Sequence, residues 1–202
     1  MDNNKIILAS KSPRRKYLLE QAGLNFSVIV SNIDESQFSL DLLPSDYVKK
    51  ISMAKAQNIG DKYPDKWILA ADTIVYINGK ILGKPSSKKH ASEMLNQLQN
   101  TVHQVVTGYT ILNINNDINI TENVITDVFF KKLTDKEIKW YLQTNEPYDK
   151  AGSYAIQGLG TFLVKSIKGS YTNVVGLPVC EVIEALINTG AIKRINERPY
   201  YE

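Results

Sequence analysis

The hydrophobic pattern of the chain is dominated by long segments that are typical of strands. The nearly continuous apolar run from Trp67 to Ile77 predicts a strand that is covered on both faces, and Asp72 interrupts it in the middle. Two further segments, His103 to Ile114 and Ile118 to Phe130, alternate between apolar and polar positions and predict an antiparallel hairpin. Shorter strands are predicted at Lys5 to Ser10, Phe26 to Val30 and Thr161 to Ile167.

A tight hairpin is predicted immediately after the long apolar run. The Asn78-Gly79 dipeptide favours a two-residue turn of type I′. The register of such a turn pairs Ile77 with Lys80, Val75 with Leu82, and Thr73 with Lys84. We therefore expect Lys84 to return to the neighbourhood of Asp72.

Helical segments alternate with these strands. Ser12 is a good N-cap before Pro13, and Thr134 begins a capping box that Glu137 completes. The predicted helices are Pro13 to Ala22, the stretch after Pro44-Ser45-Asp46 as far as about Ile59, Ser87 to Asn100 with Ala91, Met94, Leu95 and Leu98 as its core face, Thr134 to about Thr144, and a final helix with Pro178 near its start. This alternation is typical of the α/β class.

Composition narrows the class of protein. The 202 residues, of which 43% are hydrophobic and 22% charged, suit a single domain over residues 1–202 with a substantial core. No apolar run approaches the length of a membrane span, and the N-terminus lacks the pattern of a signal peptide, so we expect a cytoplasmic protein that does not bind membranes. A net charge of +3 is too small to predict general nucleic-acid binding.

The sequence lacks the residues or motifs that several other kinds of functional site require. Cys180 is the only cysteine, which excludes disulfides within the chain, and we expect it to fill the core. The only histidines, His90 and His103, are too few for a histidine metal site, and neither suggests a Ser-His-Asp triad. A Walker loop is absent, and the glycine-rich segment from Lys150 to Gly160 lacks the strand-to-helix context of a dinucleotide fingerprint. That segment predicts either close approach of the backbone to a ligand or a plain loop. The tail from Arg194 onward predicts a short helical or frayed end.

The predicted helix at Pro13 begins with Arg14, Arg15 and Lys16. Cations at the positive end of the helix dipole are unfavourable by roughly 0.3–1 kcal/mol each. An anion bound among them would remove this cost, and the free amides of a helix N-terminus suit a phosphate. A solvated basic turn with screened charges is the alternative, and this segment alone does not decide between the two.

Carboxylates and lysines occur where a strand or helix is expected to be buried. Asp72 lies inside an apolar strand, where a carboxylate is costly unless it is paired, protonated or bound to a metal. Lys55 shares the apolar stripe of its helix, and it either reaches a site or snorkels to solvent. Asp34-Glu35 follow a predicted strand. With Lys84 and the basic helix start, these residues suit a phosphate site that holds Mg²⁺.

Motifs along nearly the whole chain resemble the Maf family of nucleotide pyrophosphatases. They are Leu8 to Leu19 with Ser-Pro-Arg-Arg, Asp34-Glu35, Lys55-Ala56, Ala71 to Val75 with Ala-Asp-Thr, Leu82 to Pro85 with Gly-Lys-Pro, Ala151 to Gly158, and Gly169 to Pro178, in the order of the family. The resemblance implies an elongated, mixed, twisted sheet flanked by helices, with two lobes around a cleft. It also implies a divalent metal cofactor, Mg²⁺ or Mn²⁺, a frequent homodimer, and hydrolysis of a nucleoside triphosphate to the monophosphate and pyrophosphate.

The resemblance also implies roles for individual residues. Asp72 matches the proton acceptor for the attacking water, and Glu35 with Asp72 match the metal ligands. Lys55 and Lys84 match catalytic contacts to the polyphosphate. The further polyphosphate contacts are Ser10 and Arg15, and the residues associated with choosing the base are Arg14, Thr73 and Gln157. This last set resembles the branch that acts on dTTP and UTP, so we expect those substrates, with modified pyrimidine triphosphates as further candidates in a housecleaning role.

Other functions remain as alternatives to this enzyme. The family is named for an effect on septum formation, so a nucleotide-binding regulator of cell division, in which cleavage is secondary, is the second hypothesis. Binding of RNA through the cation cluster is a weaker one, because aromatic residues are not interleaved with the cations. The carboxylate of Asp72, expected to be buried near lysines, favours the enzyme over the binding protein, because binding alone does not need such a group.

Overall fold

One mixed sheet organises the part of the chain that the structure describes. The computed structural model describes residues 5–193, so the expected frayed tail from Arg194 onward lies outside the described residues. The strands are β1 (Ile6–Leu8), β2 (Ser27–Val28), β3 (Trp67–Ile77), β4 (Lys80–Leu82), β5 (Val102–Asn113), β6 (Ile118–Phe130) and β7 (Val164–Lys168). They pair in the order β2-β1-β3-β5-β6-β7, and β4 pairs with the part of β3 that β1 leaves free.

Both strand directions occur in this sheet. β1 is parallel to β2 and β3, whereas β3, β5, β6 and β7 form an antiparallel series. The prediction of a mixed α/β sheet is confirmed, and the predicted bounds of β3 and β6 agree with the structure. The register of β3 and β5 places Asp72 opposite Gly108. Asp72 therefore lies in the middle of the sheet.

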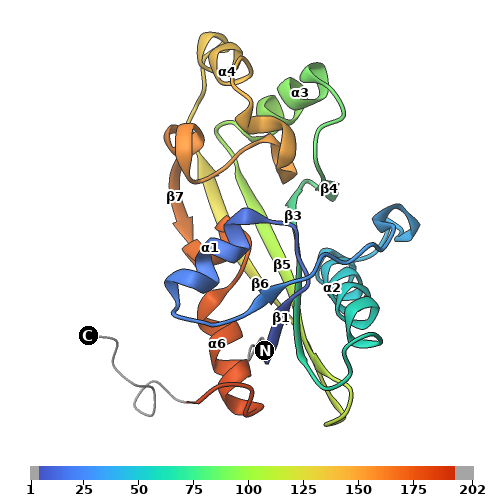
Figure 1. Ribbon diagram of the computed structural model, residues 1–202. Coiled ribbons are helices and arrows are strands. Elements are labelled where there is room, and N and C mark those ends of the chain that lie inside the picture. Colours follow the sequence, from blue (N-terminus) through green and yellow to red (C-terminus); the bar gives the residue numbers. More distant parts are fainter. Residues whose placement is uncertain (1–4, 194–202) are drawn as a thin grey trace.

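Helices cover the sheet at both ends of the long strands (Figure 1). They are α1 (Pro13–Gln21), α2 (Pro44–Gly60), α3 (Lys88–Leu98), α4 (Asp135–Tyr141), α5 (Tyr171–Val175) and α6 (Val179–Asn188), with the short 3₁₀ turns η1 (Glu35–Gln37), η2 (Glu146–Asp149), η3 (Ala151–Ser153) and η4 (Gly158–Leu163). Ser12 and Thr134 cap α1 and α4 as predicted. Within residues 5–193, every helix is too short or too polar to cross a membrane.

The long strands join two regions of packed side chains. Around α3 and α4, Leu95 and Ile138 pack with Val75 of β3 in one hydrophobic cluster. Around α1 and α6, Leu19 packs with Leu69 of β3 in another. Figure 1 shows α3 and α4 at one end of β5 and β6, and α1, α2 and α6 toward the other. β3 contributes to both clusters, so residues near its middle lie between the two lobes.

Helix α2 approaches the sheet unusually closely at Gly108. A Cβ atom at that position would lie 2.5 Å from the carbonyl carbon and oxygen of Val48. Only glycine therefore allows the helix backbone to reach β5 at this point. Val48 and Ile51 are completely buried on this face, and Lys55 follows one turn later on the same side. This contact directs Lys55 toward the middle of β3.

The hairpin after β3 is shorter than the turn chemistry predicted. The pairs between Ile77 and Lys80 and between Val75 and Leu82 are confirmed, but the predicted pair of Thr73 with Lys84 is wrong. The β4 strand ends at Leu82, because the next carbonyl, of Gly83, accepts a hydrogen bond of 3.1 Å from the Gly152 amide instead of continuing the ladder.

Two other local expectations were also wrong. Residues 161–163 belong to η4 rather than to a strand, and β7 begins only at Val164. Cys180 was expected to fill the core, but it is exposed. The buried face of α6 is formed by Val182 and Leu186, and Cys180 lies about 200° around the helix from Val182, on the opposite side.

Candidate active site

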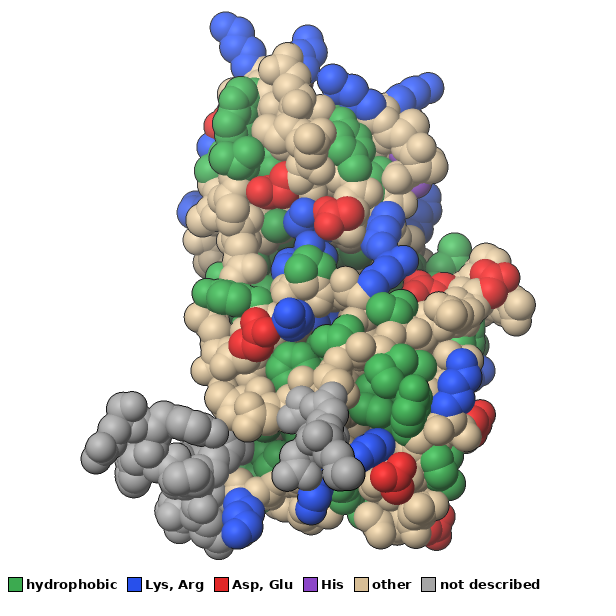
Figure 2. All heavy atoms as spheres, in the orientation of Figure 1, with side chains coloured by type: hydrophobic (Ala, Val, Ile, Leu, Met, Phe, Trp, Pro, Cys, Tyr) green, Lys and Arg blue, Asp and Glu red, His purple; other side chains and the backbone are tan. Residues whose placement is uncertain are grey.

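A cleft lies between the two lobes, beside the middle of β3. Its volume is about 780 Å³, and Figure 2 shows basic and acidic side chains side by side across the middle of this face. All the candidate residues from the sequence line it: Ser10, Arg14, Arg15, Glu35, Lys55, Asp72, Thr73, Lys84 and Gln157. These positions come from widely separated parts of the chain. The fold therefore brings the predicted set together.

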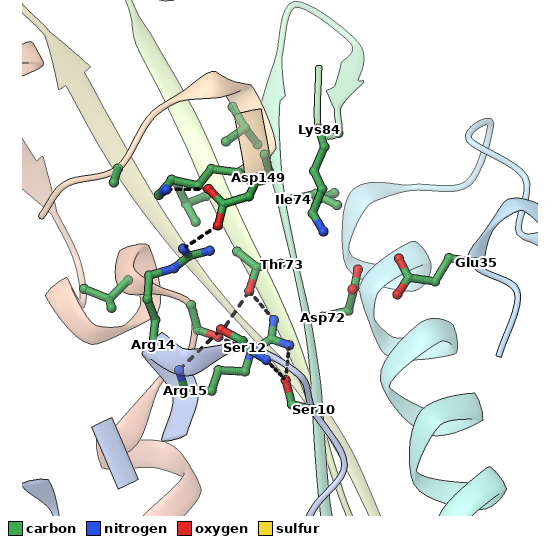
Figure 3. A pocket seen from close by; sticks show the side chains of 18 of the residues that line it. Ser10, Ser12, Arg14, Arg15, Glu35, Asp72, Thr73, Ile74, Lys84 and Asp149 are labelled. Carbon is green, nitrogen blue, oxygen red and sulfur yellow. Dashed lines mark hydrogen bonds and ion pairs between the residues drawn. The ribbon is translucent and has the colours of Figure 1, made fainter. Parts of the chain in front are cut away.

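Two carboxylates and one ammonium group form a charged cluster on one side of the cleft. Lys55 Nζ lies 2.8 Å from Asp72 Oδ1 and 2.8 Å from Glu35 Oε1. The side chains of Lys55 and Asp72 are each only 12% exposed. The expectation that Lys55 merely snorkels to solvent is wrong, because its ammonium group is paired inside the cleft. Figure 3 shows Asp72 and Glu35 with their carboxylates turned toward each other.

The charges of this group stabilise one another. Partial burial opposes ionisation of Glu35, but the hydrogen bond and the positive charge of Lys55 hold the pKa of its carboxyl below the usual value. The pKa of Tyr47, on the same helix as Lys55, shifts in the opposite direction. Burial raises the pKa of its hydroxyl most, and the negative charges of Asp72 and Glu35 raise it further. The phenol of Tyr47 therefore stays protonated beside the two carboxylates.

Arg15 is buried beneath the cleft and braces the strand that carries Asp72. Its guanidinium donates to Gly176 O at 2.8 Å, Ala71 O at 2.8 Å, Thr73 Oγ1 at 3.0 Å and Ser10 Oγ at 3.3 Å. Four of its five N–H donors are thereby used. Two of the acceptors belong to the neighbours of Asp72 in the chain. Burial lowers the pKa of Arg15, the charge of Asp72 opposing this effect.

Lys84 enters the cleft from the loop after β4 rather than through strand pairing. In Figure 3 its side chain points toward Asp72 from the opposite lobe. No hydrogen bond or ion pair of Lys84 is found within residues 5–193. Its ammonium group is therefore available to an anionic ligand. Gln157, at the start of η4, lines the same cleft from the glycine-rich segment.

An ion pair crosses the other side of the cleft. Arg14, in the first turn of α1, lies 3.5 Å from Asp149 Oδ2 of η2, and Lys150 bonds the other carboxylate oxygen, Oδ1. Partial burial opposes ionisation of Asp149, but Lys150 and then Arg14 hold the pKa of its carboxyl below the usual value. Figure 3 shows Asp149 and Arg14 together, on the side of Thr73 away from Glu35.

Sequence reasoning did not single out Asp149 and Lys150. They lie in an irregular segment, where no periodicity marks which side chains face inward. The one available signal is their position at the start of the glycine-rich segment, for which the sequence predicted either close approach to a ligand or a plain loop. The positive φ of Gly152, +66°, turns the chain there, and a Cβ atom at this position would lie 2.9 Å from Cγ2 of Val75.

The carboxylates can be tested for their fit to a divalent cation. Glu35 and Asp72 both direct an oxygen to one point, which Lys55 Nζ occupies. In the part of the chain that the structure describes, no group of three or more His, Cys, Asp or Glu side chains is arranged to hold a metal ion. Two carboxylates fit a cation such as Mg²⁺, which often takes one or two protein carboxylates and completes its shell with water and phosphate oxygens.

The fold and the cleft define an α/β enzyme with a charged site between two lobes. The model of the family described as Maf-like protein matches residues 5–189, and the chain belongs to this family. A protein of Geotalea uraniireducens (strain Rf4), named dTTP/UTP pyrophosphatase, is 47% identical over 93% of this chain and 96% of its own length. A protein of Halalkalibacterium halodurans with the same name is 50% identical over 90% of this chain and 94% of its own.

A solved structure gives a weaker similarity. A HAM1 protein from Coxiella burnetii aligns with a TM-score of 0.37 and 15% sequence identity. The alignment covers 63% of this chain and 73% of that protein. A similarity of this size carries no argument about function, and family membership depends on the sequence comparisons alone.

Proposed function

We propose that the protein is a nucleoside triphosphate pyrophosphatase that hydrolyses dTTP and UTP to the monophosphate and pyrophosphate. The observation that carries the proposal is Asp72, a carboxylate buried beside Lys55 in a cleft that unpaired Lys84 also enters. The names of the relatives supply the substrates. Modified pyrimidine triphosphates are further candidate substrates.

In this proposal Asp72 is the proton acceptor. Its Oδ1 is bonded to Lys55, whereas Oδ2 has no hydrogen-bond partner among the described residues and is available for a water molecule. As water attacks the α-phosphorus, its proton passes to Asp72, and the bond from that phosphorus to the bridging oxygen breaks. Pyrophosphate then leaves with the bridging oxygen. Lys55 pairs with Oδ1 of Asp72 and fixes the position of this carboxylate, which leaves Oδ2 to accept the proton.

The other residues bind and orient the triphosphate. Lys84 and Ser10 are proposed polyphosphate contacts, and Arg15 contributes through its one remaining N–H donor. The proposed contacts on the side of the base are Arg14, Thr73 and Gln157. Glu35 and Asp72 would hold a divalent cation, Mg²⁺ or Mn²⁺, which supplies neutralisation of the phosphate charge when bound. Binding of the cation requires Lys55 to move away from one or both carboxylates.

The direct test is a substrate panel with analysis of the products. Purified protein with Mg²⁺ or Mn²⁺ is expected to release pyrophosphate from dTTP and UTP, and orthophosphate as the product would contradict the proposal. Asp72→Asn is expected to lower kcat by about 10²–10⁴-fold, the usual contribution of a general base, because an amide cannot take the proton. Binding of UTP, measured by calorimetry, should persist in this variant.

We also propose that the chain acts in the cytoplasm as a single domain and as a homodimer. The support for this is the resemblance to the family and the match of its model to residues 5–189. Size-exclusion chromatography with light scattering measures the state directly. A monomeric mass at micromolar concentration would contradict the dimer without affecting the proposed reaction.

A further inference from the structure

The Asp149 carboxylate is flanked on both sides by donors at the cleft. Arg14 lies against one carboxylate oxygen and Lys150 against the other. Lys150 is fixed further by a hydrogen bond of 2.7 Å from its Nζ to Glu146 O. The three side chains line the cleft in a row of donor, acceptor and donor. Figure 3 shows Arg14 and Asp149 across the cleft from Glu35.

Stabilisation of the fold does not explain the pairing of Arg14 with Asp149. The Arg14 and Asp149 side chains are 30% and 63% exposed, and their separation is 3.5 Å. An exposed pair of this kind contributes about 0–1 kcal/mol to folding. The carboxylate nevertheless keeps its charge at neutral pH, because both flanking cations favour the ionised form. An ionised carboxylate can only accept hydrogen bonds.

The free edges of the nucleobases differ in the pattern that such a row recognises. Uracil and thymine present an N3–H donor between the O2 and O4 carbonyl acceptors. Cytosine presents the N3 lone pair between a carbonyl and an amino group. Guanine has two neighbouring donors beside one acceptor. The row of donor, acceptor and donor is complementary only to the acceptor, donor and acceptor of the imide edge.

We propose that Asp149 is a specificity-determining residue that accepts a hydrogen bond from N3–H of uracil or thymine, while Arg14 and Lys150 donate to the two adjacent carbonyl groups. The proposal depends on the function proposed above. It assigns the selection of the imide base to a carboxylate, because a carboxylate repels the N3 lone pair of cytosine.

The test compares UTP with CTP in the Asp149→Asn variant. The amide offers a donor as well as an acceptor, so the ratio of kcat/KM for UTP over CTP is expected to fall at least tenfold. Asp65→Asn is the matched control, because Asp65 also pairs with the next lysine in the chain, has a similar exposure of 64%, and does not line the cleft. This control is expected to keep the wild-type ratio.

A substrate analogue provides an independent measurement. The triphosphate of 3-methyluridine lacks the N3–H donor, and the wild-type protein is expected to cleave it at least tenfold less efficiently than UTP. The Asp149→Asn variant should lose much of this difference. An equal loss on all substrates in Asp149→Asn, or equal cleavage of UTP and the methylated analogue by wild type, would overturn the inference. Absence of pyrophosphate release from UTP by wild type would instead overturn the proposed function.

Discussion

Two adjacent arginines at the start of α1 have different environments. Arg14 lies at the cleft surface against Asp149, whereas Arg15 is buried and bonded to backbone carbonyls on β3 and at Gly176. The resemblance to the family implied that both arginines contact the nucleotide, whereas the basic helix start alone left a solvated turn as an alternative. The sequence did not predict that most donors of Arg15 are used inside the protein, since the carbonyl of Gly176 is 161 residues away in the chain.

This difference predicts separate effects of the two arginines. Arg15→Ala should weaken turnover of all substrates alike and destabilise the fold, because each buried acceptor left without a partner costs roughly 1–3 kcal/mol. Arg14→Ala should change the ranking of substrates with little effect on stability, since it removes an exposed ion pair. Steady-state kinetics on dTTP, UTP and CTP, with urea unfolding of each variant, measure both effects. The same pattern in both variants would show that the division of roles is wrong.

His103 gives the protein a specific dependence on acid. Its Nε2 lies 2.7 Å from the Tyr154 hydroxyl inside the cluster around α3, and burial lowers its pKa from 6.5 to about 3. The unfolded chain therefore binds the proton more readily than the folded protein between those values. The stabilisation is present above pH 6.5 and is lost progressively as the pH falls toward about 3.

The prediction concerns the slope of stability against pH. His103→Gln should reduce the loss of unfolding free energy between pH 7 and pH 4.5, because the glutamine does not titrate. His90→Gln is the control, since His90 lies in the first turn of α3 and is not among the buried side chains. Urea unfolding at both pH values gives the comparison. Parallel slopes for wild type and His103→Gln would contradict the assignment.

At the scale of elements, the long strands and most helices were predictable because their periodicity extends over several turns or pairs. The bounds of β3 and the capping box of α4 follow directly from local residue types. The end of β4 could not be predicted from local residue types, because the Gly83 carbonyl accepts a hydrogen bond from the Gly152 amide in a distant segment. The 3₁₀ turns around the cleft carry no period, so Asp149 and Lys150 could not be placed from the sequence.

The closest contact between elements predicts the effect of a single methyl group. Gly108→Ala would force α2 away from β5, because the added Cβ meets the backbone of Val48 at 2.5 Å. We expect a loss of roughly 1–3 kcal/mol in unfolding free energy, the usual cost of overpacking. Activity should fall as well, since α2 also carries Lys55. Gly83→Ala is the stability control, because its Cβ would meet no atom within 4 Å.

At the scale of the whole molecule, the cleft connects two separately packed clusters through β3. A ligand that contacts α1 on one side and the loop after β4 on the other would stabilise both lobes together. Asp72→Asn with UTP and Mg²⁺ is expected to gain about 2.7 kcal/mol at a nucleotide concentration 100 times Kd. Differential scanning calorimetry should show one transition that moves upward. A shift of only one of two resolved transitions would show that the ligand contacts a single lobe.

Removal of the cation tests whether the metal is needed for activity, for stability or for both. Chelation with EDTA is expected to abolish pyrophosphate release, and added Mg²⁺ should restore it. The ammonium group of Lys55 balances the charge of Glu35 and Asp72, so we expect the protein to fold without the metal. The melting temperature without nucleotide should therefore change little on chelation. A large decrease would show that the cation is structural.

The bond between Arg15 and Gly176 has a consequence for the synthesis of the protein. Arg15 is synthesised 161 positions before the carbonyl that it bonds. The segment beside Asp72 therefore lacks part of its bracing until α5 has been synthesised and has docked. Because closing so long a loop requires most of the chain to be in place, a nascent chain cannot assemble the complete cleft early. The site beside Asp72 would then be complete only after α5 has docked.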